Sequence, residues 1–106
     1  MPPTSHANVF RAIADPTRRA ILDRLRAGAA PVNVLASDFA QSRPAISKHL
    51  RVLRQARLVR EHRVGRERFY DIDALPLQQV AGWLEGYRAF WQYRVESPRR
   101  PLERRR

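Results

Sequence analysis

Residues 42–56 have the sequence SRPAISKHLRVLRQA, and this stretch decides the fold. Ser42 predicts the start of a helix because its hydroxyl can accept a hydrogen bond from a free backbone N–H of the first turn. Pro44 is compatible with that turn, whose N–H groups have no helical partner. At 100° per residue one stripe of the helix is apolar and should pack on a core. The stripe consists of Ile46, Leu50 and Leu53.

The opposite face of this helix carries short hydrogen-bonding groups and long cationic side chains. The residues that point away from the stripe are Pro44, Ser47, Lys48 and Arg51, with Arg43 and Arg54 on its shoulder. Such a face suits the phosphates and base edges of a DNA groove. The alternative is an ordinary amphipathic surface helix with a solvated charged side.

The preceding segment favours the DNA-binding interpretation. Residues 32–40 predict a short positioning helix, and a break at residues 40–42 separates it from the longer helix. The short helix should supply the core with Val34, Leu35 and Phe39. Two helices with this spacing have the layout of a helix-turn-helix.

A hairpin rich in arginine is predicted next. Strands over Leu58–Arg63 and Glu67–Ile72 are joined through Val64-Gly65-Arg66, where the glycine permits the turn. Long cationic side chains at its tip would reach the DNA backbone along an adjacent minor groove. These side chains are Arg63, Arg66 and Arg68. The alternative is a tip that only adds solubility.

Charge is concentrated in this part of the chain. The 106 residues carry a formal net charge of +11 at pH 7, which indicates a polyanionic partner, and residues 43–68 contain nine basic residues against two glutamates. The chain has no cysteine, which excludes disulfides, thiolate metal sites and cysteine nucleophiles.

Length and hydropathy predict one domain in the cytosol. Residues 1–5 are expected to be disordered, residues 6–96 to form the domain, and residues 97–106, SPRRPLERRR, to form a basic tail. We expect no association with a membrane, since no apolar run approaches the roughly 20 residues that cross a bilayer. The N-terminus also lacks the pattern of a secretion signal.

Two helices are predicted before the helix-turn-helix. The first spans His6–Ala14, with Ser5 as a possible cap. The second begins after Asp15, with Pro16 in its first turn, and ends at Gly28. Its predicted buried face consists of Ala20, Ile21, Leu22 and Leu25.

A long helix over Leu75–Val95, capped by Asp73, has an apolar face wider than one small domain can bury. Exposed patches of this size mark interfaces, and aromatic residues are their usual anchors. We therefore predict a homodimer interface formed by the first and last helices. The assigned residues are Val9, Phe10, Ile13, Trp83, Leu84, Tyr87, Phe90 and Trp91. The alternatives are an aromatic core of one protomer and a pocket for an apolar ligand.

Three segments together resemble the arsenical-repressor (ArsR) family of bacterial winged-helix transcriptional repressors. They are ADPTRRAIL, LASDFAQSRPAISKHLRVLRQARLV and RVGRERFYDI, and the resemblance covers residues 9–95. It implies a homodimer with two recognition helices in successive major grooves of a pseudo-palindromic operator. The recognition-helix positions that match the family's DNA contacts are Ser42, Arg43, Ser47, Lys48 and His49, and the arginines beside Gly65 match its wing. For His49, packing at the edge of the stripe competes with a DNA contact.

The chain departs from the family pattern in two places. Arg57 follows the recognition helix where glycine is usual, and because a left-handed arginine costs on the order of 1 kcal/mol, we expect this helix to end differently. The turn carries Ala40 and Gln41 where glycine and an apolar residue are common.

Metal sensing is not predicted. Metal-responsive relatives use cysteines, or carboxylates and histidines on the last helix, where this chain offers only Glu85 and Glu96. We expect no metal and no cofactor, and no small-molecule effector can be identified.

The predicted fold is mainly α-helical with a small β-hairpin, a winged helix-turn-helix. The predicted function is that of a sequence-specific, dimeric repressor of double-stranded DNA. The first alternative is a nonspecific architectural DNA-binding protein, which the charge permits, and the second is a protein-interaction module. No enzyme is expected, since the sequence lacks a nucleophile elbow, a glycine-rich phosphate loop and clustered carboxylates.

Overall fold

The computed structural model describes the backbone of residues 4–96 and the side chains of residues 8–92. Four helices come first, α1 (Thr4–Ala12), α2 (Pro16–Leu25), α3 (Val32–Asp38) and α4 (Arg43–Gln55), with β1 (Ala30–Pro31) between α2 and α3. The hairpin β2 (Val59–Val64) and β3 (Glu67–Ile72) follows, and α5 (Leu77–Glu85) and α6 (Arg88–Glu96) end the described chain. The predicted tail, residues 97–106, lies outside the described residues, and Ser5 lies inside α1 rather than at its cap.

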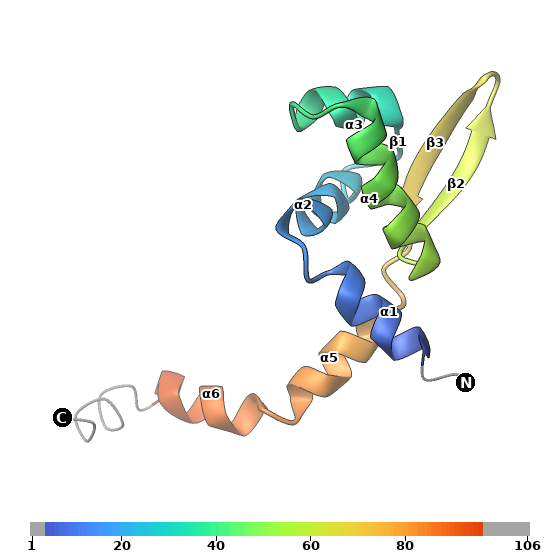
Figure 1. Ribbon diagram of the computed structural model, residues 1–106. Helices are drawn as coiled ribbons and strands as arrows, with labels where there is room; N and C mark the ends of the chain where they lie inside the picture. Colours follow the sequence, from blue (N-terminus) through green and yellow to red (C-terminus); the bar gives the residue numbers. More distant parts are fainter. Residues whose placement is uncertain (1–3, 97–106) are drawn as a thin grey trace.

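The core lies between α2, α3, α4 and the base of the sheet (Figure 1). The predicted stripe of α4 is confirmed, since Ile46, Leu50 and Leu53 are at most 1% exposed. From the other elements the core takes Ile21, Leu25, Leu35 and Leu58, each equally buried. Val34 is 39% exposed, so its predicted place in the core is wrong. It lies one position before the buried Leu35 on a helix of only two turns, on its solvent side.

Both predicted helix starts are confirmed by their hydrogen bonds. The Asp15 carboxylate accepts a hydrogen bond from the backbone N–H of Arg18 at 3.0 Å. The Ser42 hydroxyl accepts one from the N–H of Ala45 at 3.2 Å. In both helices proline stands in the first turn, where its missing N–H costs nothing. These caps set where α2 and α4 begin.

The prediction that α4 ends differently because Arg57 replaces the usual glycine is wrong. Arg57 has a φ of +63°, which is the left-handed conformation. The N–H of Leu58 donates to the carbonyl of Leu53 at 3.0 Å, and the N–H of Arg57 donates to that of Arg54 at 2.9 Å, a Schellman motif. The helix therefore ends as if glycine were present, because burial of both Leu53 and Leu58 outweighs the strain.

The same ending closes α3. Ala40 has a φ of +51°, and the N–H of Gln41 donates to the carbonyl of Ala36 at 3.1 Å. The turn between the two helices of the motif therefore also carries a non-glycine residue in a left-handed conformation.

The sheet has three strands in the order β1-β3-β2, all antiparallel. The hairpin closes with Val64 opposite Glu67 and Gly65 at a φ of +63°, so the turn has two residues. The third strand, β1, was not predicted, because two residues are too few to show an alternating pattern. It pairs Ala30 with Tyr70 and ties the loop before α3 to the hairpin.

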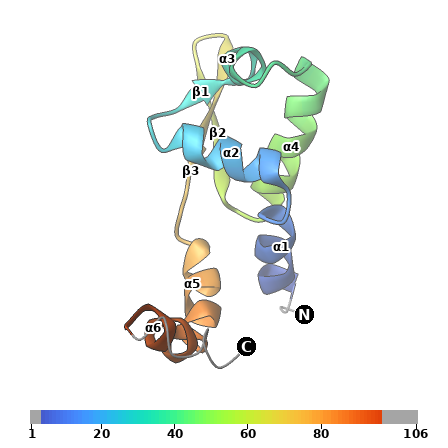
Figure 2. The ribbon, with the colours of Figure 1, turned by 90° about the vertical axis from the view of Figure 1, so that its left-hand side faces the viewer.

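The predicted single helix over Leu75–Val95 is wrong. Gly86 and Tyr87 form a turn between α5 and α6, and both donate to carbonyls three residues back, which tightens the chain. Asp73 accepts a hydrogen bond from the N–H of Leu75 at 3.1 Å, but α5 begins only at Leu77. Figures 1 and 2 show α5 and α6 leading away from the helix-turn-helix, with α1 beside α5.

In the described residues no helix is both long enough and apolar enough to cross a membrane.

Replacing Arg57 by glycine should stabilise the protein. The left-handed strain is removed, and the greater freedom of glycine in the unfolded chain offsets part of that gain, so the free energy of unfolding should rise by about 0.5–1 kcal/mol. Urea denaturation measures it. The control is Gln55→Gly at the last residue of α4, which should lower the same quantity by about 0.5–1 kcal/mol. A loss of stability in Arg57→Gly as large as that in the control would contradict the strain argument.

Candidate DNA interface

The outward face of α4 presents most of the predicted recognition residues to solvent. Opposite the buried stripe, the exposed residues are Ser42, Arg43, Pro44, Ser47, Lys48 and Arg51. Within residues 8–92 no ion pair involves Arg43, Lys48 or Arg51. Their charges are therefore available to a polyanion.

The hairpin and α4 enclose a polar groove. Arg43 and Ser47 of α4 line one side of it, and Arg66 and Arg68 of the hairpin line the other. Asn33, at the start of α3, and Glu67, at the start of β3, also line the groove. Four residues predicted separately from two motifs are thus brought to one surface. Arg63 lies opposite Arg68 in the strand register but does not line this groove.

His49 is separated from this surface. Its Nδ1 lies 3.5 Å from a guanidinium nitrogen of Arg18 and 3.9 Å from a carboxylate oxygen of Asp15, and the side chain is 22% exposed. Of the two predicted roles, the structure therefore places His49 in packing against the start of α2, and we omit it from the proposed DNA contacts.

Arg18 links three elements at that point. Its guanidinium donates to the carbonyl oxygens of Ala12 at 2.7 Å and Arg11 at 3.1 Å, which neutralises the C-terminal end of α1. The pKa of Asp15 lies below its ordinary value, first because the carboxylate accepts the Arg18 backbone N–H and then because Arg18 and His49 lie nearby. Sequence periodicity carries no signal for this arrangement.

Glu61, which the sequence analysis did not assign, gathers three partners. Its carboxylate lies 3.2 Å from Arg54, accepts from Arg68 at 3.1 Å, and accepts from the Tyr70 hydroxyl at 3.2 Å. The pKa of Tyr70 is raised by burial and by the charge and hydrogen bond of Glu61. Arg68, predicted as a DNA contact, thus has a protein partner. The sequence signals this cluster only indirectly, through the hairpin turn at Gly65, whose position brings Glu61 opposite Tyr70.

The residues predicted for the dimer interface divide into two groups. Val9 is 1% exposed and belongs to the core of its own protomer, so its assignment to the interface is wrong. Ile13 is half-buried against the same core. Of the others, Phe10, Trp83, Tyr87 and Phe90 form a chain of aromatic contacts, in which Phe10 meets Trp83 edge-on at 5.7 Å between ring centroids.

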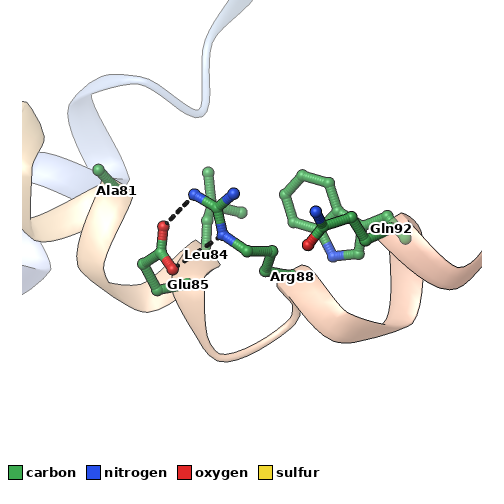
Figure 3. A pocket seen from close by; sticks show the side chains of 6 residues that line it. Ala81, Leu84, Glu85, Arg88 and Gln92 are labelled. Atoms are coloured by element: carbon green, nitrogen blue, oxygen red, sulfur yellow. Dashed lines mark hydrogen bonds and ion pairs between the residues drawn. The ribbon is translucent and has the colours of Figure 1, made fainter. Parts of the chain in front are cut away.

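Beyond α1 this chain is open to solvent. Trp83 contacts Tyr87 at 5.3 Å between ring centroids, and Tyr87 contacts Phe90 at 6.1 Å. We call the exposed part the aromatic face, which consists of Trp83, Leu84, Tyr87, Phe90 and Trp91, each 36–68% exposed. A groove on α5 and α6 is lined by Leu84 and Trp91 of this face together with Glu85 and Arg88. Figure 3 shows the ion pair of Glu85 with Arg88 beside Leu84.

Among the described residues no group of three or more metal-ligating side chains comes together. His49 and His62 lie on different elements, α4 and β2.

The pair α3–α4, followed by the hairpin, defines a winged helix-turn-helix DNA-binding domain. A sequence profile of the family described as helix-turn-helix domain matches residues 13–62. Known proteins of this class identify its family.

Two curated relatives and one solved structure carry this assignment. The transcriptional repressor SdpR of Bacillus subtilis is 43% identical over 77 residues, which cover 73% of this chain and 86% of SdpR. The HTH-type transcriptional regulator Rv2034 of Mycobacterium tuberculosis is 50% identical over 82 residues, 77% of this chain and 74% of Rv2034. The crystal structure of an ArsR family transcriptional regulator superimposes with a TM-score of 0.74 at 37% identity, covering 87% of this chain and 95% of that one. The chain therefore belongs to the ArsR family of winged helix-turn-helix transcriptional regulators, and it is a transcriptional regulator with a helix-turn-helix DNA-binding domain.

Replacing Asp15 by asparagine should flatten the dependence of stability on acid pH. Because the folded-state pKa is depressed, the carboxylate stabilises the fold above its unfolded pKa of about 4, and this contribution is lost as pH falls through the lower folded value. Asparagine keeps the cap but does not titrate. Urea midpoints measured from pH 6 down to about pH 2.5 test this. Asp23→Asn, at an exposed carboxylate 4.0 Å from Arg26, is the control; equal slopes in both variants would refute the role of Asp15.

Proposed function

We propose that this protein is a sequence-specific, dimeric transcriptional repressor that binds a pseudo-palindromic operator in double-stranded DNA. The observation that carries the proposal is the exposed cationic face of α4 beside the groove lined by Arg43, Ser47, Arg66 and Arg68. A recognition helix in the major groove and a hairpin over the neighbouring backbone would both contact the duplex from this surface.

The residues of the face divide by their chemistry. Arg43, in the first turn of α4, can donate two hydrogen bonds to O6 and N7 of guanine. Ser47 lies one turn further along and offers a short donor and acceptor to a base edge. Lys48 and Arg51 suit phosphates, because long cationic side chains neutralise the backbone without reading sequence. Arg66, at the tip of the wing, suits the backbone or minor groove.

The aromatic face supports the dimer. Five large apolar side chains at 36–68% exposure are costly to leave in water, and aromatic side chains anchor interfaces. A second copy of the same face would bury them and would present two α4 helices to one duplex. Phe10 on α1 adjoins this face through Trp83, which extends the proposed interface to the first helix.

Selection of bound duplexes from a random pool tests the proposal as a whole. A repeated, inverted half-site with centres about 10 base pairs apart is the expected result. Titration of that duplex against a scrambled one should give a preference of at least about 10³. Equal affinities with a steep salt dependence would instead indicate the nonspecific architectural protein that the net charge permits.

Arg43→Ala should relax base preference at about one position in each half-site. The loss of a bidentate contact should weaken operator binding by about 1–3 kcal/mol and leave scrambled DNA less affected. Arg66→Ala is the matched control, since the loss of a backbone contact should weaken both duplexes alike and reduce the salt slope by about one. Measured titrations in which Arg43→Ala keeps the wild-type preference would show that α4 is oriented differently.

Trp91→Asp should separate the protomers and weaken operator binding. A charge introduced into the aromatic face would be buried without a partner when two copies associate, and it therefore opposes association. Sedimentation velocity measures the mass. Val64→Asp places the same charge on an exposed apolar residue of the wing and should leave the dimer intact. A dimer that persists in Trp91→Asp would disprove the proposed interface.

A further inference from the structure

We propose that Glu61 is a positioning residue that holds the wing at a set angle to α4 and thereby raises the preference for operator over other DNA. The inference rests on the proposed DNA-binding function and adds to it a residue to which no DNA contact is assigned. It comes from the convergence of three elements on one carboxylate.

The contacts of Glu61 join α4 to both strands of the wing. One carboxylate oxygen of Glu61, on β2, lies 3.2 Å from Arg54 near the end of α4. The other accepts from Arg68 and Tyr70, both on β3. With 17% of its side chain exposed, Glu61 is shielded from solvent more than either arginine, at 49% and 60%. Contacts with charged donors in such a site are stronger than those between exposed ions.

Beyond Glu61 the wing does not pack on the core. Every residue from His62 to Arg68 is exposed, and the stacking of His62 on Phe69, at 6.1 Å between ring centroids, lies within the wing itself. A hairpin of two strands is marginally stable on its own in water. Its direction therefore depends on contacts at its base. These are the pairing of β1 with Phe69 and Tyr70 and the contacts of Glu61, which is the last residue of β2 that is not exposed.

The direction of the wing matters for DNA binding because Arg66 and Arg68 share a groove with Arg43 and Ser47. When the wing is already oriented, less conformational freedom is lost as both elements contact one duplex. A loose wing still attracts phosphates, since its arginines remain, but the combined fit to one site is poorer. Loss of the Glu61 charge also leaves Arg54 and Arg68 without a counter-charge, which favours any DNA.

A role of charge alone can be separated from a role in positioning. Glu67 lies on the same wing, is exposed, lines the groove beside Arg66 and Arg68, and takes part in no ion pair within the described residues, so it tests the effect of charge at the groove without the contacts of Glu61. We call the contacts of Glu61 with Arg54, Arg68 and Tyr70 the brace. Glu61→Gln and Glu67→Gln change the net charge equally, and only the first removes the brace. Arg54→Gln removes the brace from the side of α4, at a half-exposed residue whose replacement leaves the core intact.

The first measurement uses the DNA-free protein. Hydrogen exchange of the backbone amides of residues 60–71 should be roughly three- to ten-fold faster in Glu61→Gln and in Arg54→Gln, because local opening of the wing becomes easier. Glu67→Gln should stay within about two-fold of the wild type, and the core amides of α4 should be unchanged in all three. Unchanged exchange in both brace variants overturns the proposal.

The second measurement titrates the selected operator and a scrambled duplex. Glu61→Gln should bind scrambled DNA more tightly and lose about ten-fold in preference, whereas Glu67→Gln should strengthen both complexes and keep the preference. An unchanged preference in Glu61→Gln overturns the role in DNA binding. If exchange is faster but the wild type shows no preferred duplex, the brace stands and the proposed operator binding fails.

Discussion

Burial of Ile46, Leu50 and Leu53 is the constraint on which the rest of the structure depends. These three side chains are sealed in the core, and they set the rotation of α4 about its own axis. Once the rotation is set, the residues on the far side of the helix must face solvent, because each position differs from the next by 100°. Core packing thus decides which side chains can meet DNA.

Polar contacts then determine how the other elements sit around α4. Arg18 holds the end of α1 and touches His49, and Glu61 holds the wing through Arg54. The first contact reaches α4 at His49, next to α1, which itself lies beside α5, and the second reaches it at Arg54, next to the wing. The recognition helix is therefore tied by charged groups to both the proposed dimer interface and the proposed wing contact.

Two features run against local preference and show what tertiary packing can impose. Ala40 and Arg57 adopt the left-handed conformation at the ends of α3 and α4, where glycine is favoured. Each closes a Schellman motif, and at Arg57 the flanking leucines are fully buried. At Gly86 no buried side chain opposes the local preference of glycine, because the chain there is exposed. The helix predicted over residues 75–95 accordingly breaks into α5 and α6.

The sequence by itself determined the helix starts at Asp15 and Ser42, the buried stripe, the turn at Gly65 and the cationic face, because caps, helical periodicity and glycine turns are local properties. It identified the family by the same segments. Only the tertiary structure decided that Val9 is core, that His49 packs on α2, that β1 joins the sheet, and that Glu61 collects Arg54, Arg68 and Tyr70. These facts depend on residues far apart in the chain, and no periodicity within one element records which distant side chain lies opposite.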